Sequence, residues 1–471
     1  MTDYRRLRVA LLGAGAVGSQ VASLLRRHGD ELADRAGAHL ELVGIAVRNP
    51  DAPRETDLPR ELFTTDAEQL ITGADIVIEL MGGIEPARAH LLHAINSGAD
   101  VVTANKALLA THGPEIFEAA DQVGAQVYYE AAAAGAIPII RPLRDSLAGD
   151  RVQRIMGIVN GTTNYILDRM DSEGAEFADV LADAQRLGYA EADPTADIEG
   201  FDAAQKAAIL ASLAFHTTVP LDAVHREGIT GVDKAMMDAA RHAGYVIKLL
   251  AVCERLTESS EVRSTSSGVS RYASAPLLDN RTAYRDAISV RVYPALVRRD
   301  HPLASVRGAN NAVFVQAEAA GNLMFYGAGA GGVQTASAVL GDVVSAARRH
   351  IAGGVGVGES TRANLPILPI DAVTTRYQIT LEVDDQPGVL ATVAGILSDG
   401  EVSIATVEQT VRSEPVPGNG GAGAEPASDT VARLVIGTHK AREANLSATV
   451  DRLAASGVVE RVVSVLRVEG D

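Results

Sequence analysis

The chain has 471 residues, of which 47% are hydrophobic and 22% are charged, and its formal net charge is −18 at pH 7. At about 150 residues per domain, this length predicts about three domains of a soluble globular protein, and the composition excludes a disordered chain. The acidic balance argues against a nucleic-acid partner, and the single cysteine, Cys253, excludes an intramolecular disulfide framework and fits a reducing cytoplasm.

The N-terminal part of the chain alternates between short apolar strands and helices. Short continuous apolar strands separated by helices predict an α/β fold with a parallel sheet that is covered on both faces. None of these segments approaches the roughly 20 apolar residues needed to cross a bilayer, so no membrane association is expected. Strands are predicted at residues 7–12, 40–47, 75–80, 100–103 and 126–129, and helices at 17–28, 86–97 and 115–123.

Residues 136–352 have the pattern of a second, α+β domain, which we expect to bind the substrate and to contribute to a dimer interface. Its last helix, at 333–349, is expected to return to the N-terminal domain, and residues 353–375, rich in Gly, Pro and polar residues, to form a linker. Strands are predicted at residues 152–159, 288–297, 312–318 and 323–326, and long helices at 202–215 and 233–256.

Residues 376–471 have the order strand, helix, strand, strand, helix, strand, which predicts a ferredoxin-like βαββαβ domain. Residues 413–428, rich in Gly, Pro, Ala and Glu, are predicted to form a hairpin loop. The strands are expected at residues 377–383, 402–411, 430–436 and 459–468, and the helices at 388–397 and 441–455.

The motif Gly13-x-Gly15-x-x-Gly18 follows the first apolar strand and opens a helix. Such a turn lets pyrophosphate approach the backbone, and the free N–H groups of the helix start, with Ala16 and Val17, then bind the phosphates. This context favours a Rossmann-type dinucleotide-binding domain at residues 1–135 over a merely structural turn.

The end of the second strand indicates which dinucleotide binds. NAD sites usually place an acidic residue there, on the ribose hydroxyls. The strand instead ends in Val47, Arg48 and Asn49. Arg48 could pair with a 2′-phosphate, which favours NADP and leaves NAD possible. The alternative is a solvated loop arginine.

Two segments carry candidate chemistry. The strand at residues 100–103 delivers Lys106 to the edge of the sheet where ligands collect, although this lysine could simply extend outward from a helix start. Asp202 and Lys206 share one face of a helix, where an ordinary surface ion pair is the alternative. The almost wholly apolar run after Lys206 indicates a buried helix, and a buried lysine beside a carboxylate is a functional candidate.

Four segments, at residues 101–106, 160–164, 188–206 and 327–342, resemble the signature segments of homoserine dehydrogenases and occur in that family's order. The resemblance covers residues 5–350, and the segment 188–206 is its most specific part. It implies NAD(P)H-dependent reduction of L-aspartate 4-semialdehyde to L-homoserine, on the route to threonine and methionine.

The resemblance also implies roles for individual residues. Lys206 would donate a proton to the developing alkoxide, and Asp202 would orient it. Lys106 would lie between cofactor and substrate, and Glu191 would hold the substrate ammonium group. The further assignments are Asp197 to substrate binding, and Thr103, Lys106 and Gly329 to the nicotinamide side.

Homoserine dehydrogenases tend to bind a monovalent cation, sodium or potassium, through one carboxylate and main-chain carbonyl groups. The matching stretch places such a site at Glu130, Ala133, Gly135 and Ile137. A purely structural strand-to-loop junction is the alternative reading of this stretch.

The C-terminal domain resembles an ACT domain, a module that binds small amino acids and pairs sheets between chains. Asp384, Pro387 and Gly388 follow an apolar strand, and Gly388 would let a ligand carboxylate approach a helix start. The resemblance implies threonine as a feedback effector and a homodimer or homotetramer. Alternatively, the domain serves only to hold an oligomer together.

Two other functions compete with this interpretation. Aldehyde oxidation to an acyl phosphate, as in aspartate-semialdehyde dehydrogenase, needs a reactive thiolate, whereas Cys253 lies in an apolar run that we expect to be a core helix. A non-catalytic protein that senses a nucleotide and an amino acid would have no need for Glu191, Asp202 and Lys206 together.

Overall fold

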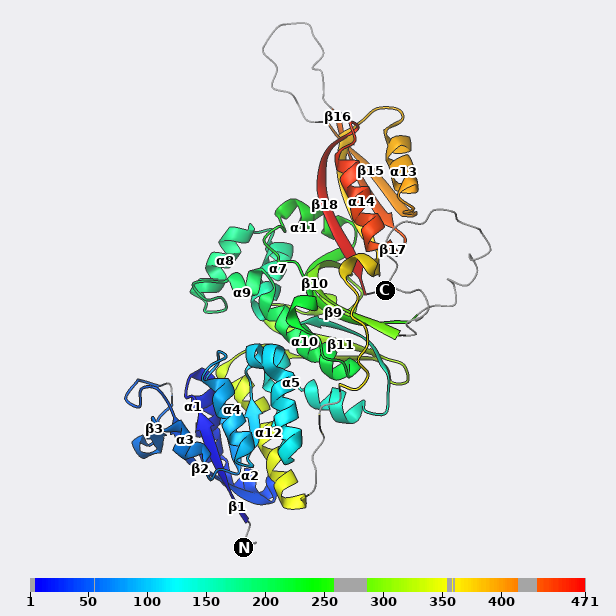
Figure 1. Cartoon of the computed structure of the whole chain (residues 1–471). Coiled ribbons are helices and arrows are strands. Elements are labelled where there is room, and N and C mark those ends of the chain that lie inside the picture. Colours follow the sequence, from blue (N-terminus) through cyan, green and yellow to red (C-terminus); the bar gives the residue numbers. More distant parts are fainter. Residues whose placement is uncertain are drawn as a thin grey trace.

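The computed structural model describes residues 5–54, 56–257, 286–353, 358, 361–413 and 430–470. Its N-terminal part (blue in Figure 1), its middle part and its C-terminal lobe (orange and red) follow one another along the molecule. Within these residues no helix is both long and apolar enough to span a membrane. The predicted loop at 413–428 lies, apart from Ser413, outside the described residues.

The N-terminal sheet has six parallel strands in the order β3-β2-β1-β4-β5-β6, which confirms the predicted parallel sheet. Alternate residues of β1 face opposite layers: Leu7, Val9 and Leu11 belong to one core, Ala10 and Leu12 to the other. The strands are β1 (Arg5–Leu12), β2 (Ala38–Ala46), β3 (Phe63–Thr64), β4 (Ile76–Glu79), β5 (Asp100–Thr103) and β6 (Val127–Tyr128).

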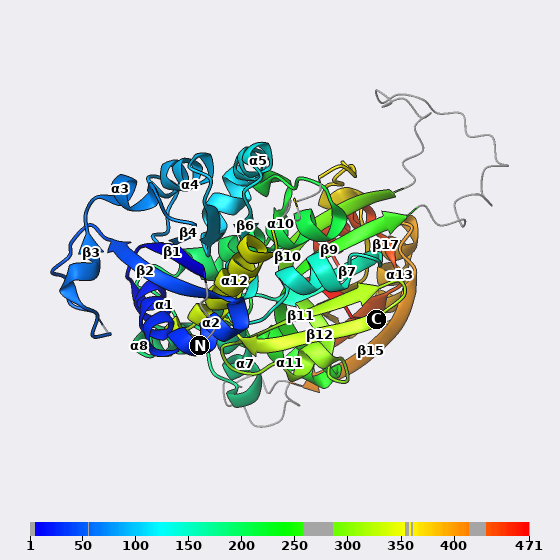
Figure 2. The ribbon, with the colours of Figure 1, turned by 90° about the horizontal axis from the view of Figure 1, so that it is seen from below.

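Helices cover both faces of this sheet. One layer holds α1 (Ala16–Arg27) and α2 (Gly29–Ala36), and the late helix α12 (Gly332–Ala352) returns to pack against both. Viewed from this end of the molecule, α12 lies beside α2 (Figure 2). The other layer holds α3 (Ala67–Ile71), α4 (Ala87–Asn96) and α5 (Lys106–Val123). Helix α5 begins nine residues before the predicted start at 115 because the Asn105 side chain caps it.

The second sheet has ten strands in the order β12-β11-β7-β9-β10-β18-β14-β16-β15, with β8 beside β10. Strand β10 pairs in parallel with β18, so the middle and C-terminal parts share one continuous sheet, which the predicted linker did not suggest. The strands are β7 (Val152–Ile158), β8 (His225–Arg226), β9 (Tyr245–Thr257), β10 (Asp286–Arg298), β11 (Asn310–Ala317), β12 (Gly321–Ala328), β14 (Tyr377–Asp384), β15 (Ile404–Ser413), β16 (Thr430–Thr438) and β18 (Val459–Glu469).

Further elements pack around this sheet. Strands β14, β15, β16 and β18, with α13 and α14, have the predicted βαββαβ order. Strands β13 (Thr374–Thr375) and β17 (Ala441–Arg442) form a separate pair. The helices are α6 (Ala131–Ala134), α7 (Gly161–Glu173), α8 (Phe177–Arg186), α9 (Thr195–Ile198), α10 (Phe201–Phe215), α11 (Lys234–His242), α13 (Val389–Asp399) and α14 (Glu443–Ala454).

The predicted helix at residues 233–256 is confirmed only as far as His242, and the rest of the prediction is wrong. Helix α11 ends at His242, Gly244 adopts a positive φ of 81°, and β9 follows. A continuous apolar run has no periodicity that separates a buried helix from a central strand, and β9 lies between β7 and β10. Cys253 therefore lies on a strand and not on a helix. It is still buried, and burial raises the pKa of its thiol to about 12, so a thiolate mechanism remains excluded.

Candidate active site

The glycine turn after β1 has the geometry that close phosphate binding needs. Gly13 has a positive φ of 98°, and a Cβ at Gly13 would meet the carbonyl oxygen of Leu80 at 2.6 Å. A Cβ at Gly18 would collide with the carbonyl oxygen of Gly13, whereas nothing lies within 4 Å of the corresponding position at Gly15. Protein atoms thus occupy the space beside Gly13 and Gly18, whereas Gly15 leaves open space at the exposed start of α1.

The glycine-rich segment before α12 lies against this turn. A Cβ at Gly332 would come within 2.9 Å of the carbonyl oxygen of Ala16, next to Val17 on α1. Gly329 covers the side chain of Asn311, because any Cβ there would collide with the Asn311 amide group. Asn311 is completely buried, and neither of its amide atoms has a hydrogen-bond partner within the described residues. Gly329 and the start of α1 therefore belong to one region.

Arg48 lies just beyond the end of β2 and is exposed. Its side chain forms no hydrogen bond or ion pair with any described residue. No residue that the structure describes therefore engages the guanidinium group, which fits a side chain that binds an anionic ligand.

The ends of β4 and β5 are organised by a buried carboxylate that the sequence analysis missed. Glu79 is fully buried, and it accepts hydrogen bonds from the Thr103 hydroxyl at 2.6 Å and from the backbone N–H of Met81 at 2.8 Å. Its only signal in the sequence is that it is the one acid within an apolar strand. The Asn105 side chain donates to the Gly83 carbonyl at 2.6 Å and accepts from a backbone N–H of α5, which fixes Lys106 as the first helical residue.

Asp202 joins the two predicted lysines. Its Oδ2 accepts from Lys206 Nζ at 2.7 Å, and its Oδ1 forms an ion pair with Lys106 Nζ. Lys206 Nζ also donates to the carbonyl oxygen of Val159 at 2.6 Å. The Lys206 residue is 9% exposed, whereas the Lys106 side chain is 41% exposed. Because Lys106 begins α5 and the other two belong to α10, this cluster connects the nucleotide-binding part to the middle part of the molecule (Figure 1).

Burial and the opposite charge of a neighbour shift the pKa values of these groups in opposite directions. Burial alone would raise the pKa of Asp202, but the ammonium groups of Lys206 and Lys106 outweigh it and hold this pKa well below its ordinary value. Burial lowers the pKa of Lys206, the Lys106 charge lowers it further, and Asp202 opposes both effects. A lysine whose pKa is lowered is a better proton donor than an ordinary one.

Asn160 is a second polar residue of the site to which the sequence analysis gave no role. It caps α7 by accepting from the Thr163 N–H at 2.8 Å. Its Nδ2 donates to Asp202 Oδ2 at 2.9 Å and to Asp197 Oδ1 at 2.7 Å. Asp197 therefore lies next to the Asp202–Lys206 pair, and burial raises the pKa of its carboxyl group.

Glu191 is exposed on the loop between α8 and α9. Its backbone carbonyl accepts from Gln185 Nε2 at 3.2 Å, and its carboxylate has no partner among the described residues. The structure therefore shows no direct contact between Glu191 and Asp202 or Lys206, and its predicted role stays a prediction.

The Glu130 carboxylate, expected to hold a cation, is engaged by the protein itself. Oε1 accepts from the N–H groups of Ile139 at 2.5 Å and Ile140 at 2.7 Å, and Oε2 accepts from Arg141 N at 3.0 Å and Nε at 2.9 Å. The described residues contain no cluster of three or more His, Cys, Asp or Glu side chains suited to a metal ion. A cation site that uses the Glu130 carboxylate does not fit these contacts.

The oxygens that remain in this stretch are main-chain carbonyls around a tight turn. Ala133 lies in α6, Gly135 follows that helix with a positive φ of 64°, and Ile137 comes directly after the turn. A Cβ at Gly135 would collide with the carbonyl oxygen of Gly329, so the turn packs against the glycine-rich segment.

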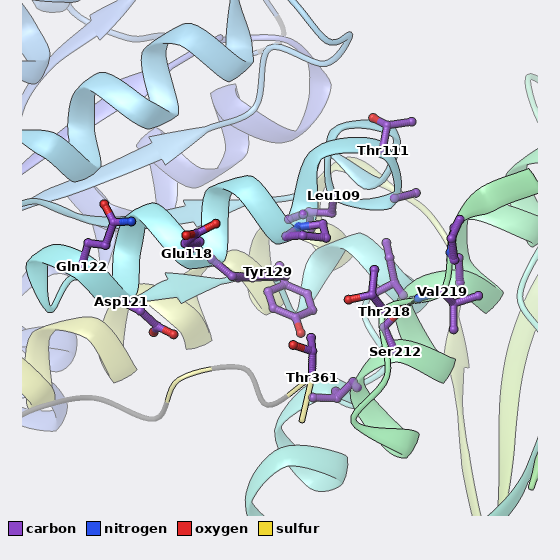
Figure 3. A pocket seen from close by; sticks show the side chains of 18 residues that line it. Leu109, Thr111, Glu118, Asp121, Gln122, Tyr129, Ser212, Thr218, Val219 and Thr361 are labelled. Carbon is purple, nitrogen blue, oxygen red and sulfur yellow. Dashed lines mark hydrogen bonds between the residues drawn. The ribbon is translucent and has the colours of Figure 1, made fainter. Parts of the chain in front are cut away.

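A cavity of about 790 Å³ lies between α5 and α10 (Figure 3). Its wall includes Leu109 and Tyr129 from the nucleotide-binding part and Ser212 from α10. None of the predicted site residues lines it. The cavity is therefore separate from the Lys106–Asp202–Lys206 cluster, although α5 and α10 contribute to both.

A dinucleotide turn on a parallel sheet, together with a buried lysine held by a carboxylate, defines a nicotinamide-dependent oxidoreductase. The homoserine dehydrogenase family model matches residues 138–344, and the model for the NAD-binding domain of homoserine dehydrogenase matches residues 13–130. The chain belongs to the homoserine dehydrogenase family.

Individual relatives agree with this assignment over the whole chain. The chain is 51% identical to homoserine dehydrogenase of Corynebacterium glutamicum over 465 residues (98% of this chain, 96% of the relative). It is 51% identical to that of Mycobacterium tuberculosis over 470 residues (99% of each chain). The crystal structure of a homoserine dehydrogenase from Thiobacillus denitrificans matches with a TM-score of 0.83 at 37% identity, covering 99% of each chain.

Proposed function

We propose that this chain reduces L-aspartate 4-semialdehyde to L-homoserine with NADPH, using Lys206 as the proton donor. The observation that carries the proposal is the Lys206–Asp202 pair: a buried ammonium group held at 2.7 Å by a carboxylate, at the junction of the nucleotide-binding and middle parts. Family membership supports the substrate class.

NADP is proposed over NAD because of Arg48. The second strand supplies no acid for the ribose hydroxyls, and the Arg48 guanidinium is exposed and unpaired with respect to the described residues. The free space at Gly15 and the exposed start of α1, with Ala16 and Val17, fit the pyrophosphate. Thr103, Lys106 and Gly329 are proposed to border the nicotinamide.

The chemistry divides between cofactor and protein. The bound nicotinamide supplies hydride to the aldehyde carbon. Lys206 Nζ gives its proton to the carbonyl oxygen as negative charge develops there, so the product is a hydroxyl group and Lys206 becomes neutral. Asp202 keeps the ammonium group oriented, and Lys106, which is more exposed, is proposed to stabilise the same oxygen or the substrate carboxylate.

Two acidic residues are proposed to bind the substrate ammonium group. Asp197 is held beside Asp202 by Asn160, and Glu191 offers an unpaired carboxylate on the loop that precedes α9. Two carboxylates of this kind suit a substrate that carries an ammonium group, such as an amino acid, better than they suit a simple aldehyde.

A monovalent cation, sodium or potassium, is proposed only in a modified form. Because donors from the protein occupy the Glu130 carboxylate, the ligands would be the main-chain carbonyl oxygens of Ala133, Gly135 and Ile137. Such a cation would stabilise the turn that packs on Gly329. A rise in thermal stability with sodium or potassium at constant ionic strength would support it, and equal stability in a large organic cation would contradict it.

The C-terminal lobe is proposed to be an ACT-type regulatory domain that binds threonine in a homodimer or homotetramer of a cytoplasmic enzyme. The support is its βαββαβ order and Gly388, which has a positive φ of 95° at the start of α13. A lobe that serves only in assembly is the alternative, and it predicts no response to threonine.

One kinetic comparison tests these proposals. Oxidation of NADPH and of NADH is followed with L-aspartate 4-semialdehyde, with and without threonine. We expect turnover, a preference for NADPH and inhibition by threonine. Binding of nucleotide and threonine without turnover would instead favour a non-catalytic sensor.

A further inference from the structure

The C-terminal lobe contacts the middle part through a buried arginine on β18. Arg467 pairs in register with Ala295 of β10, and its side chain is only 12% exposed. Its Nε donates to Glu443 Oε1 within the lobe at 2.7 Å, and its Nη1 donates to Glu227 Oε2 of the middle part at 2.9 Å. Arg467 therefore links carboxylates on the two sides of the β10–β18 junction, where β18 (red in Figure 1) reaches β10.

Glu227 is itself fixed to strand β10 of the second sheet. Its backbone N–H donates to the Val292 carbonyl of β10 at 2.8 Å, and its Oε1 lies 2.7 Å from His225 Nε2. The side chain is thus held by two partners, His225 and Arg467, and the backbone by a third, Val292. A displacement of β18 would therefore be transmitted to the chain around residue 227.

The residues after Glu227 lie directly on the backbone of α9. Ile229 N donates to the Ile198 carbonyl at 2.8 Å, and the Thr230 hydroxyl donates to Glu199 Oε1 at 3.0 Å. Only glycine fits at position 228, because a Cβ there would lie 2.5 Å from the Ile198 carbonyl oxygen. Within segment 227–230, residues 228–230 therefore contact residues 198–199.

Residues 198–199 lie between the two acidic residues of the site. Asp197 precedes them, and Gly200 and Asp202 follow, with Gly200 in the left-handed conformation that starts α10. Asn160 holds both carboxylates. A shift of residues 198–199 would therefore move Asp197 relative to Asp202, whereas Lys206 is one helical turn further on and is held separately by Val159.

We propose that Glu227 is a positioning residue, which uses its contact with Arg467 to couple the C-terminal lobe to the substrate-binding segment around Asp197. The proposal rests on the proposed function of Asp197 in binding the substrate ammonium group. The coupling acts on substrate affinity more than on the chemical step, because the proton donor is anchored independently of segment 227–230.

The test is Glu227→Gln in the full-length enzyme, with Glu382→Gln as the matched control. Glu382 also binds two arginines, Arg433 at 3.1 Å and Arg461 at 2.9 Å, but both lie within the C-terminal lobe. We expect Glu227→Gln to raise the KM for the semialdehyde about three- to tenfold while kcat and the KM for NADPH change less than about twofold. The control is expected to leave all three parameters unchanged.

Amide hydrogen exchange on the enzyme without substrate provides a readout that is independent of turnover. Glu227→Gln is expected to speed exchange at Ile229, whose N–H bonds to Ile198, and at residues 199–200, and Glu382→Gln is not. Arg467→Gln should reproduce the result. Unchanged exchange and KM in Glu227→Gln would overturn the coupling, as would equal effects in the control. If exchange changes but the wild-type enzyme shows no turnover, the proposed function fails and the coupling stands.

Discussion

Replacing Lys206 by methionine tests the proposed chemistry most directly. Methionine keeps much of the apolar volume and removes the ammonium group. Lys206 makes two short hydrogen bonds, at 2.6 Å to the Val159 carbonyl and at 2.7 Å to Asp202. Removal of a general acid typically costs a factor of about 10² to 10⁴, which corresponds to about 3–5 kcal/mol in activation free energy. We therefore expect kcat/KM for semialdehyde reduction to fall by that factor.

The same substitution also has a structural cost, which has to be separated from the chemical one. The Val159 carbonyl loses its charged donor, and an unsatisfied buried acceptor costs about 1–3 kcal/mol. Asp202 keeps Lys106 and Asn160, so its charge stays compensated. The folded protein should therefore survive with a lowered unfolding temperature and an unchanged affinity for NADPH.

The chain contains a matched control for this loss. Lys248 is also a buried lysine with two hydrogen bonds, at 2.9 Å to Asn164 Oδ1 and at 2.7 Å to the Val306 carbonyl, and burial lowers its pKa to about 8. Lys248→Met should lower stability by a similar amount but leave kcat within several-fold of the wild type. The assays are NADPH oxidation, NADPH binding and thermal unfolding. If Lys206→Met keeps most of its kcat, or if Lys248→Met loses as much, the assignment of Lys206 as proton donor is wrong.

Three further substitutions test separate parts of the site. Because Asp202 raises the pKa of Lys206, Asp202→Asn is expected to move the alkaline fall of the kcat/KM–pH profile to lower pH, and an unmoved profile would contradict the pairing. Arg48→Ala is expected to raise the KM for NADPH about tenfold and to leave that for NADH unchanged; equal changes for both would remove the 2′-phosphate argument. Burial raises the pKa of Asp342 to about 7, so the folded state holds its proton more tightly than the unfolded chain and the wild type loses stability as pH rises from about 4 to 7. Asp342→Asn does not ionise, so urea unfolding should show its stability relative to the wild type improving by on the order of 3 kcal/mol from pH 4 to pH 8, whereas a constant difference would mean that this carboxyl group titrates normally.

Local patterns predicted those parts of the protein that depend on local spacing. The glycine motif after an apolar strand predicted the dinucleotide turn, and the four-residue spacing of Asp202 and Lys206 on an apolar helix predicted their buried pair. The same reasoning failed at β9, where burial on both faces removes any periodicity, and the apolar run around Cys253 was interpreted as a helix.

The remaining features depend on contacts between distant segments. The contact between Lys106 and Asp202 requires two domains to dock, and no spacing within either segment encodes it. Glu79 and Asn160 organise the site through hydrogen bonds to neighbouring strands and helices, and each looks like an ordinary polar residue in the sequence. The hydrogen bonds that the Glu130 carboxylate accepts from N–H groups nine to eleven residues later likewise depend on how the chain after α6 folds back.

The different exposure of the two lysines suggests how one carboxylate can serve both. Asp202 keeps its pKa well below the ordinary value, so it stays ionised throughout the neutral range and always presents two acceptor oxygens. Lys206, which is 9% exposed, also donates a hydrogen bond to the Val159 carbonyl, so moving its ammonium group away would leave that buried carbonyl without its donor. Lys106, whose side chain is 41% exposed, is held by Asp202 in the only ion pair that the described residues give it, so an incoming substrate carboxylate can compete for it. Such an exchange would free Oδ1 of Asp202 while Oδ2 still holds Lys206, and the proton donor would keep its orientation as the substrate binds.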